Sequence, residues 1–232
     1  MSSFYHKKWY QKWWGVLLII FSLLVIITII SSTMYFFNTK KAIESGALQI
    51  DPETGEVFNP QELREGTSNY YLGTKNPELT IVMFSDLNCP YCKKAFDVIT
   101  EEIIKQYSNK VKIIHRDLPI LGEDSIALSL AGRCAGEQGK FWNMIDKLFE
   151  KQGEFELEEL PDIAEQIGAN RLQFINCMAE ERYLGAIRQD MKDADTMNID
   201  RTPTYMFNEY KASGHIEKDQ FELYINNLLE NN

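Results

Sequence analysis

Cysteine, histidine, proline and glycine are all scarce in this chain of 232 residues, which has 4 Cys, 3 His, 7 Pro and 13 Gly. Four cysteines are too few for a disulfide-dense miniprotein, and their spacing does not suit a four-thiolate zinc site. The low Pro and Gly content, with 44% hydrophobic residues, excludes a collagen-like or disordered chain. The length fits one domain with an appendage, or two small domains.

Basic residues are also in deficit, since 24 Lys and Arg face 34 Asp and Glu, for a net charge of −10. The first 41 residues contain five lysines and no acidic residue, so the rest of the chain carries the whole negative surplus. A body of that charge repels phosphate backbones. We therefore expect no binding of nucleic acid.

One long hydrophobic run is present near the N-terminus. No charged residue lies between Lys12 and Lys40, and aromatic residues flank the run at both ends. About 20 apolar residues span a bilayer, so residues 13–37 predict a single transmembrane helix. A cleaved signal peptide is the alternative, but its apolar part would be shorter and would end at an Ala-x-Ala site, which is missing here.

The lysines at the two ends of this run bear on its orientation. Three lie before it, within residues 1–12, and Lys40 and Lys41 follow it. This small excess predicts a cytoplasmic tail at 1–12 and an extracytoplasmic body attached to the cell membrane. Residues 38–70 read as a polar linker, whose acidic residues we interpret as a solvated segment and not as a calcium loop.

The remaining chain alternates strand and helix patterns. Apolar β-forming runs predict strands, and apolar residues at helical spacing predict helices. A strand, a helix and a second strand in succession predict a right-handed parallel unit, to which a later hairpin adds antiparallel strands. The expected elements are strands at 79–85, 110–115, 204–207 and 211–215, and helices at 89–107, at 123–198 with breaks near Gly139, Gly153, Pro161 and Gly168, and at 218–229.

The chemistry concentrates in Cys89-Pro90-Tyr91-Cys92, where the first expected strand gives way to a helix. A thiol at a helix N-terminus faces unpaired N–H groups, which stabilise its thiolate. Pro90 suits the first helical turn, where an N–H is not needed. We predict that Cys89 is the exposed nucleophile of low pKa and that Cys92 is the resolving thiol.

Metal binding by this dithiol is the competing interpretation. Zinc would need further ligands, yet the chain has no second Cys-x-x-Cys pair and its three histidines are scattered. We interpret His115 as a core or edge residue and His215 as a surface residue. A copper metallochaperone remains an alternative of another class, although no histidine lies in a matching loop.

Three motifs together resemble the DsbA-like thiol–disulfide oxidoreductases of the thioredoxin superfamily. They are the segment from Thr80 through the dithiol to Lys93, Gly139-Lys-Phe-Trp142, and Arg201-Thr-Pro-Thr-Tyr205. The resemblance implies an α/β thioredoxin fold over 71–232 with a helical insertion at about 118–195. It also implies that Thr202 and Pro203 form a cis-proline loop that binds substrate, although Pro203 alone could equally begin a strand.

The chain departs from that family at one position. The family often carries an acidic residue six positions before the nucleophile, where it shuttles a proton for the resolving thiol, and this chain has Met83 there. The nearest acid is Asp86, which we take as a candidate proton relay.

The other two cysteines, Cys134 and Cys177, each lie on an apolar helical face. Two buried free thiols are one interpretation, because cysteine is often buried. In an oxidising compartment we expect a structural disulfide within the insertion, as related proteins sometimes have.

The resemblance implies an extracytoplasmic enzyme that introduces disulfides into exported proteins through Cys89 and Cys92. Its partners would be cysteine-containing exported proteins and a quinone-linked reoxidase in the membrane, and we expect no cofactor and no metal. An isomerase or reductase using the same residues is the alternative, because Pro90 and Tyr91 do not fix the redox potential.

Overall fold

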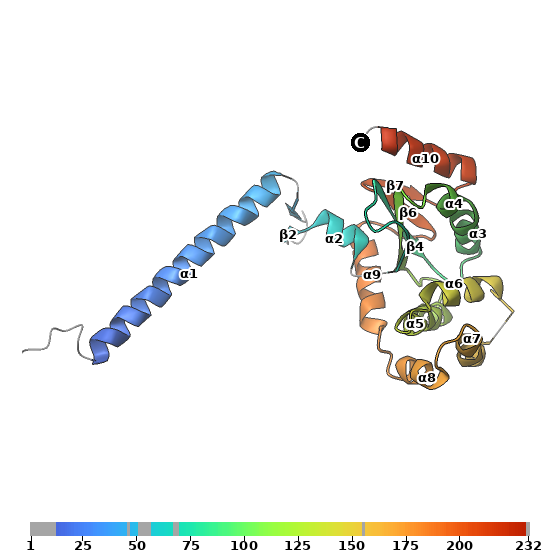
Figure 1. Cartoon of the computed structure of the whole chain (residues 1–232), viewed down its shortest axis with the longest axis horizontal. Helices are drawn as coiled ribbons and strands as arrows, with labels where there is room; N and C mark the ends of the chain where they lie inside the picture. Colours follow the sequence, from blue (N-terminus) through green and yellow to red (C-terminus); the bar gives the residue numbers. More distant parts are fainter. Residues whose placement is uncertain (1–12, 46, 51–56, 67–69, 155, 231–232) are drawn as a thin grey trace, which may run out of the picture. The chain divides into compact units, whose positions relative to one another are not determined.

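A computed structural model describes residues 13–45, 47–50, 57–66, 70–154 and 156–230 (Figure 1). The predicted tail at 1–12 and the acidic residues of the linker at 51, 53 and 56 lie outside the described residues. The chain divides into two compact units, Met1–Pro60 and Gln61–Asn232. Each unit is described by itself.

Helix α1 (Trp13–Glu44) dominates the first unit. It is long and apolar enough to cross a membrane, and the hydroxyls of Ser22, Thr28 and Thr33 donate to carbonyls of the same helix. At 1.5 Å per residue the helix measures about 48 Å, against about 30 Å for a hydrocarbon core. It continues past the predicted end at residue 37 because its polar final turns contain helix-compatible residues, such as the Lys40–Glu44 pair.

The predicted linker contains short elements. Strands β1 (Gln49–Ile50) and β2 (Val57–Phe58) pair antiparallel, and α2 (Pro60–Glu65) follows them. Elements of two to six residues are too short to show a periodic hydrophobic pattern, which explains why the sequence did not predict them.

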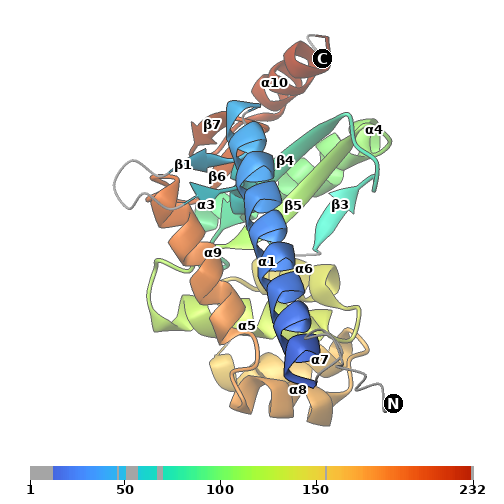
Figure 2. The ribbon, with the colours of Figure 1, turned by 90° about the vertical axis from the view of Figure 1, so that its left-hand side faces the viewer.

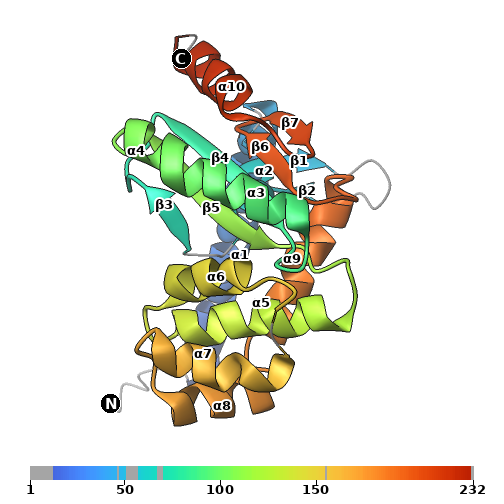
Figure 3. The same ribbon diagram turned by 90° about the vertical axis from the view of Figure 1, so that its right-hand side faces the viewer.

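The second unit is built on a five-stranded sheet with the order β3-β5-β4-β6-β7 (Figure 3). The parallel pair predicted from the sequence is confirmed in β4 (Leu79–Ser85) and β5 (Val111–Asp117). The predicted hairpin is confirmed in β6 (Thr204–Phe207) and β7 (Tyr210–Ser213), and β6 pairs antiparallel with β4. The carboxyl ends of β4 and β5 therefore lie at one edge of the sheet, beside the start of β6.

Strand β3 (Tyr71–Gly73) pairs antiparallel with β5 at the sheet edge and was not expected. At the end of β3, the backbone of Gly73 lies close to that of Val111. Gly73 has a φ of +92°, and a Cβ at that position would lie 2.1 Å from the Val111 carbonyl oxygen. Only glycine fits this end of the strand.

Helices cover both faces of the sheet. On one face lie α3 (Pro90–Val98), which continues through a π-helical turn into α4 (Ile104–Tyr107), and α10 (Lys218–Glu230) (Figure 3). On the other face lies α9 (Leu184–Thr196) (Figure 2). The buried residues between the sheet and α3 include Ile81, Met83, Ala95, Ile99, Ile113, Tyr205 and Phe207.

The chain between β5 and β6 forms the helical insertion, as expected. The breaks predicted at Gly139, Gly153 and Gly168 fall between helices, but Pro161 lies in a first helical turn, where proline is tolerated. A further break near Glu181, which has a φ of 46°, was not predicted. Before α9, the insertion consists of α5 (Glu123–Gly136), α6 (Phe141–Glu150), a 3₁₀ turn (Leu157–Glu159), α7 (Leu160–Gln166) and α8 (Arg171–Ala179).

Candidate active site

Cys89 lies directly before α3, as its N-cap residue, and Pro90 begins the helix. The Cys89 carbonyl accepts from the backbone N–H groups of Cys92 and Lys93, at 3.0 and 3.2 Å. Its N–H donates to the Asp86 carbonyl at 3.1 Å, which closes the turn between β4 and the helix. The sulfur of Cys89 therefore sits at the positive end of a helix, where a thiolate is stabilised.

The loop before β6 covers this sulfur. The Thr202–Pro203 peptide bond is cis, and Cys89 Sγ lies 3.6 Å from the Thr202 carbonyl oxygen. Cys89 is only 6% exposed. The prediction that Cys89 is exposed was thus wrong, because a loop 113 residues away in sequence shields it.

The two thiols have opposite electrostatic environments. A hydrogen bond from the Cys92 thiol outweighs burial and lowers the pKa of Cys89 to about 5, with further help from the Thr202 side chain and the N–H groups of Cys92 and Tyr91. Cys92 is fully buried, and burial raises its pKa far above the ordinary value. The pair therefore has one ready nucleophile and one thiol that needs a proton acceptor before it can react.

The end of β4 surrounds Cys92 with two polar groups. The backbone N–H of Asp86 points at Cys92 Sγ over 3.5 Å, and the Ser85 side chain lies close enough to oppose the rise in the pKa of Cys92. The carboxylate of Asp86 is occupied elsewhere. It accepts from the N–H groups of Asn88, Ile120 and Leu121 at 2.8, 2.8 and 3.0 Å. Asp86 thus ties the dithiol loop to the segment that follows β5, and its role as a proton relay stays a prediction.

Met83 is buried on the sheet face below α3. In the strand register it lies between His115 of β5 and Tyr205 of β6. The Tyr205 hydroxyl is buried without a hydrogen-bond partner among the described residues, and burial raises the pKa of Tyr205. This row of side chains lies directly under the helix that carries Cys92.

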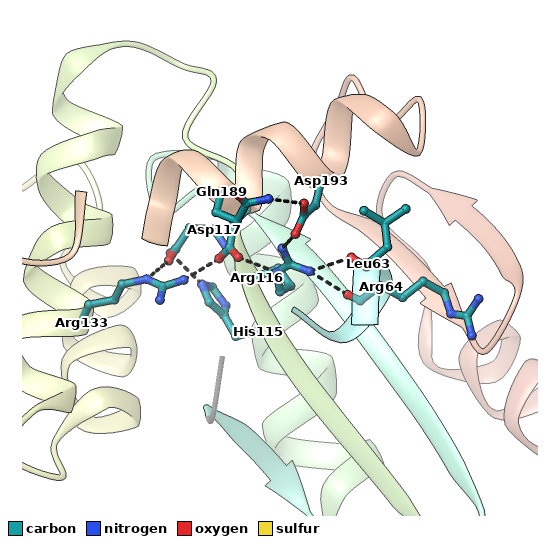
Figure 4. Close-up of polar contacts among 9 residues, drawn as sticks. Leu63, Arg64, His115, Arg116, Asp117, Arg133, Gln189 and Asp193 are labelled. Carbon is teal, nitrogen blue, oxygen red and sulfur yellow. Dashed lines mark hydrogen bonds and ion pairs between the residues drawn. The ribbon is translucent and has the colours of Figure 1, made fainter. Parts of the chain in front are cut away.

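A buried network of charges extends from this row into the insertion (Figure 4). Arg116 bonds Asp190 at 2.6 Å and Asp193 at 2.5 Å, and Arg133 of α5 bonds Asp117 at 2.5 Å and also reaches Asp190. Burial works against ionisation of Asp117, but Arg133 and His115 hold its pKa at about 2. Burial raises the pKa of Asp190, and the two arginines oppose that effect.

This network fastens three parts of the second unit together. Arg116 also donates to the backbone carbonyls of Leu63 and Arg64 in α2, at 3.0 and 2.9 Å (Figure 4). Its guanidinium therefore joins α2, the sheet and α9. No sequence pattern predicts this network, because its members are far apart along the chain.

Cys134 of α5 and Cys177 of α8 form a disulfide, with their Cα atoms 5.7 Å apart. Both are about 1% exposed and lie in the core of the insertion. Cys89 and Cys92 are free thiols.

The other residues singled out in the sequence are placed as follows. Tyr91 is 57% exposed, and Lys94 lies over its ring at 5.7 Å. Lys93 donates to the Glu150 carbonyl of α6. His215 was predicted at the surface, but its side chain is only 17% exposed, and its Nε2 lies 3.3 Å from Oε1 of Glu217. Within the described residues, no group of three or more His, Cys, Asp or Glu could hold a metal ion.

Comparison with known families settles the fold at the level of the family. The family model described as Thioredoxin matches residues 65–227. The chain belongs to this thioredoxin family. The match contains the dithiol, the cis-proline loop and the whole helical insertion.

Among curated proteins, the chain resembles Na(+)/H(+) antiporters named NhaA. It is 31% identical over 169 residues to NhaA 3 of Salinispora tropica and 30% identical over 169 residues to NhaA 1 of Salinispora arenicola. Each alignment includes 72% of this chain but only 24% of the antiporter. The chain therefore spans about a quarter of the length of these relatives.

Solved structures of thiol–disulfide oxidoreductases match more completely. A thioredoxin-like oxidoreductase from Silicibacter pomeroyi is 25% identical with a TM-score of 0.67, over 73% of this chain and 98% of that one. Oxidised BdbD from Bacillus subtilis is 26% identical with a TM-score of 0.63, over 69% and 92%. The thiol-disulfide exchange protein alpha-DsbA2 from Wolbachia pipientis, at 20% identity, shares the fold with a TM-score of 0.66. This thioredoxin-family chain thus has the fold of DsbA-like oxidoreductases, as predicted, preceded by a helix that fits membrane anchoring.

Proposed function

We propose that this protein is a membrane-tethered oxidase that introduces disulfides into exported proteins through Cys89 and Cys92. The observation that carries the proposal is the asymmetry of the dithiol. A pKa of about 5 for Cys89 stabilises the reduced form of the enzyme, and stabilising the reduced form makes the disulfide a stronger oxidant.

The reaction runs in two exchanges. A thiolate of the client protein attacks the sulfur of Cys89, the bond between Cys89 and Cys92 breaks, and Cys92 leaves as a thiolate and takes up a proton. A second client thiolate then attacks the client sulfur of the mixed disulfide and expels Cys89 as a thiolate. The client loses two electrons and two protons, and the enzyme gains the electrons as a dithiol.

The loop at Thr202 and Pro203 would hold the client during these exchanges. It lies against Cys89, and an extended client peptide would pair with the backbone of this loop, as in other cases of strand addition. Reoxidation requires an electron acceptor, for which we propose a quinone-linked membrane protein. Helix α1 would keep the body near such a partner, with the N-terminus in the cytoplasm and the catalytic body outside.

Trapping of mixed disulfides tests the division of labour between the two thiols. Cys92→Ser should accumulate mixed disulfides with client proteins on non-reducing gels, because no second thiol can release the client. Cys89→Ser should accumulate none. Equal trapping by the two variants would contradict the assignment.

The equilibrium potential of the couple in glutathione buffers separates an oxidase from an isomerase or reductase. An oxidase should lie well above about −200 mV, toward the most oxidising thioredoxin-like proteins. A membrane-impermeant thiol probe should also label Cys89 on intact cells. Labelling only after lysis would place the body in the cytoplasm and remove the case for an oxidase.

A further inference from the structure

Cys92 needs a proton acceptor, and the position where related enzymes carry an acid holds Met83. A thioether cannot accept a proton from a thiol in this range. The carboxylate of Asp86 is already bonded by three backbone N–H groups. Another proton acceptor for Cys92 is therefore expected on the face of the sheet that carries Met83.

His115 lies beside Met83 on that face. The two residues are partners in the parallel register of β4 and β5, and neighbouring residues in such a register point to the same side of a sheet. His115 is 1% exposed, and its ring packs edge-on against Phe141 at 5.3 Å. It is thus a buried titratable group next to the position of the missing acid.

The hydrogen bonding of His115 leaves one ring nitrogen available. Nε2 lies 3.2 Å from Oδ1 of Asp117, which as a carboxylate can only accept. A neutral imidazole that donates from Nε2 has an acceptor lone pair on Nδ1. Among the described residues, Nδ1 is buried without a hydrogen-bond partner.

Ser85 is a polar side chain on this face of the sheet, and it lies close to Cys92. It is fully buried at the end of β4, pairs in register with Asp117, and shares the sheet face of Met83. Its hydroxyl lies close enough to Cys92 to oppose the rise in the pKa of that thiol, and no well-formed hydrogen bond within the described part of the chain holds it elsewhere. A hydroxyl offers one donor and two acceptor sites, which lets it pass a proton along.

Charged groups from several elements surround His115. Asp117 of the same strand bonds it, Arg133 of α5 bonds Asp117, and Asp190 of α9 accepts from the Asp117 N–H at 3.1 Å. Tyr70, before β3, also lies nearby, since its carbonyl accepts from the His115 N–H. The network of Figure 4 joins three aspartates to two arginines, and a protonated imidazole adds a third cation.

We propose that His115, held by Asp117, accepts the proton of Cys92 through the Ser85 hydroxyl and so replaces the acid that is missing at Met83. The proposal rests on the proposed thiol–disulfide chemistry. In the reducing direction, the Cys92 proton moves to Ser85 as the Ser85 proton moves to Nδ1 of His115. The Cys92 thiolate then attacks Cys89, the bond between Cys89 and the client breaks, and the client leaves as a thiolate. In the oxidising direction the proton returns to Cys92.

Stopped-flow kinetics of the reduced full chain in detergent micelles would test this. The substrate is an aromatic disulfide whose released thiolate absorbs visible light. Attack by Cys89 releases the first thiolate, and closure of the ring by Cys92 releases the second, so the two steps appear as two phases. If the wild type shows no first phase, the proposed function fails; the present proposal concerns the second phase alone.

His115→Gln keeps a donor toward Asp117 and removes the basic nitrogen. It should slow the second phase at pH 7 by about 100-fold, as expected for loss of a general base, and leave the first phase within about twofold. The wild-type rate should level off with rising pH, whereas the variant should continue to rise tenfold per pH unit. Met83→Glu in the His115→Gln background should restore the second phase, which a merely structural role of His115 would not allow.

His215→Gln is the matched control, because His215 also has a buried Nδ1 with no partner in the described part of the chain, and its Nε2 bonds Glu217. It should leave both phases unchanged. Ser85→Ala should slow the second phase as well, and it decides the matter if His115→Gln does not fold. A second phase of wild-type rate in either folded variant, or one slowed only by Asp86→Asn, would overturn the proposal.

Discussion

The two pairs of cysteines in this molecule have opposite surroundings. Cys89 and Cys92 are three residues apart at the start of a helix, beneath a loop that reaches one of them. Cys134 and Cys177 are 43 residues apart and join two helices in the core of the insertion. The first pair has an asymmetric environment suited to exchange, whereas the second is enclosed by apolar side chains on both sides. Surroundings and loop length, more than the sulfur itself, separate a reactive pair from a structural one.

The largest expected effect is on the rate at which the thiols react. At pH 7 a thiol with a pKa of about 5 is almost fully ionised, against about 3% for an ordinary thiol, so Cys89 should have a thiolate fraction about 30-fold higher. Its alkylation rate should have a midpoint near pH 5. Mass spectrometry of the reduced protein should find Cys89 labelled first and Cys92 last. Labelling of Cys92 at a comparable rate would show that the asymmetry does not exist in solution.

Arg133 lies next to Cys134 on α5 and bonds Asp117 of β5. A change at Arg133 therefore tests what holds the insertion to the sheet. Arg133→Met removes a buried partner from Asp117 and Asp190. It should lower the free energy of unfolding by about 3–5 kcal/mol, because buried carboxylates are left uncompensated. Arg182→Met is the control. That residue forms exposed ion pairs with Glu137 and Glu180, and its loss should cost about 1 kcal/mol or less.

The same variant should change the acid sensitivity of the fold. The pKa of Asp117 is lowered to about 2, so its contribution to stability is complete above about pH 4 and is lost as the pH falls toward 2. Between pH 5 and pH 2, the unfolding free energy of Arg133→Met should therefore depend less steeply on pH than that of the wild type. Equal slopes would mean that Asp117 is not held by Arg133.

Removal of the structural disulfide should have the next largest effect. The double variant Cys134→Ala with Cys177→Ala should lose about 2–4 kcal/mol of unfolding free energy, because the unfolded chain is no longer constrained. Its Cys89 alkylation profile should stay the same. The double variant Cys89→Ala with Cys92→Ala, compared with wild type whose Cys89 and Cys92 are reduced, also lacks two sulfurs but no bridge, and it should lose less. Stability of the Cys134 and Cys177 double variant equal to that of the wild type would contradict this prediction.

Asp86→Asn should have the smallest effect of the series. It weakens three backbone hydrogen bonds that tie the dithiol loop to the segment after β5, at a cost of about 1–2 kcal/mol in unfolding free energy. Thermal and urea denaturation would measure it. Stability equal to that of the wild type would mean that the amide replaces the carboxylate fully.

The sequence predicted those parts of the molecule whose cause is local. Apolar β-forming runs predicted β4 and β5, and the Cys-x-x-Cys motif before a helix predicted the position of the dithiol. Helical spacing predicted the helices between residues 123 and 198, which the family resemblance implied to be an insertion. Composition and spacing alone could not predict the contact between Cys89 and Thr202, since it joins residues 113 positions apart, and only the family resemblance implied a loop that faces the dithiol. His115 was interpreted as a core residue, and only the strand register shows that it lies beside Met83.

The hold of Arg116 on the carbonyls of Leu63 and Arg64 has a mechanical consequence. Helix α2 follows the first unit in the chain, so a pull exerted through the N-terminal segment enters the second unit at α2. Arg116 lies on β5 and bonds Asp190 and Asp193 of α9, so it links α2 to the interior of the second unit. The turn that contains Cys89 is held by other hydrogen bonds, which the carbonyl and the carboxylate of Asp86 accept. A force applied at α2 is thus resisted by bonds other than those that hold the turn of Cys89.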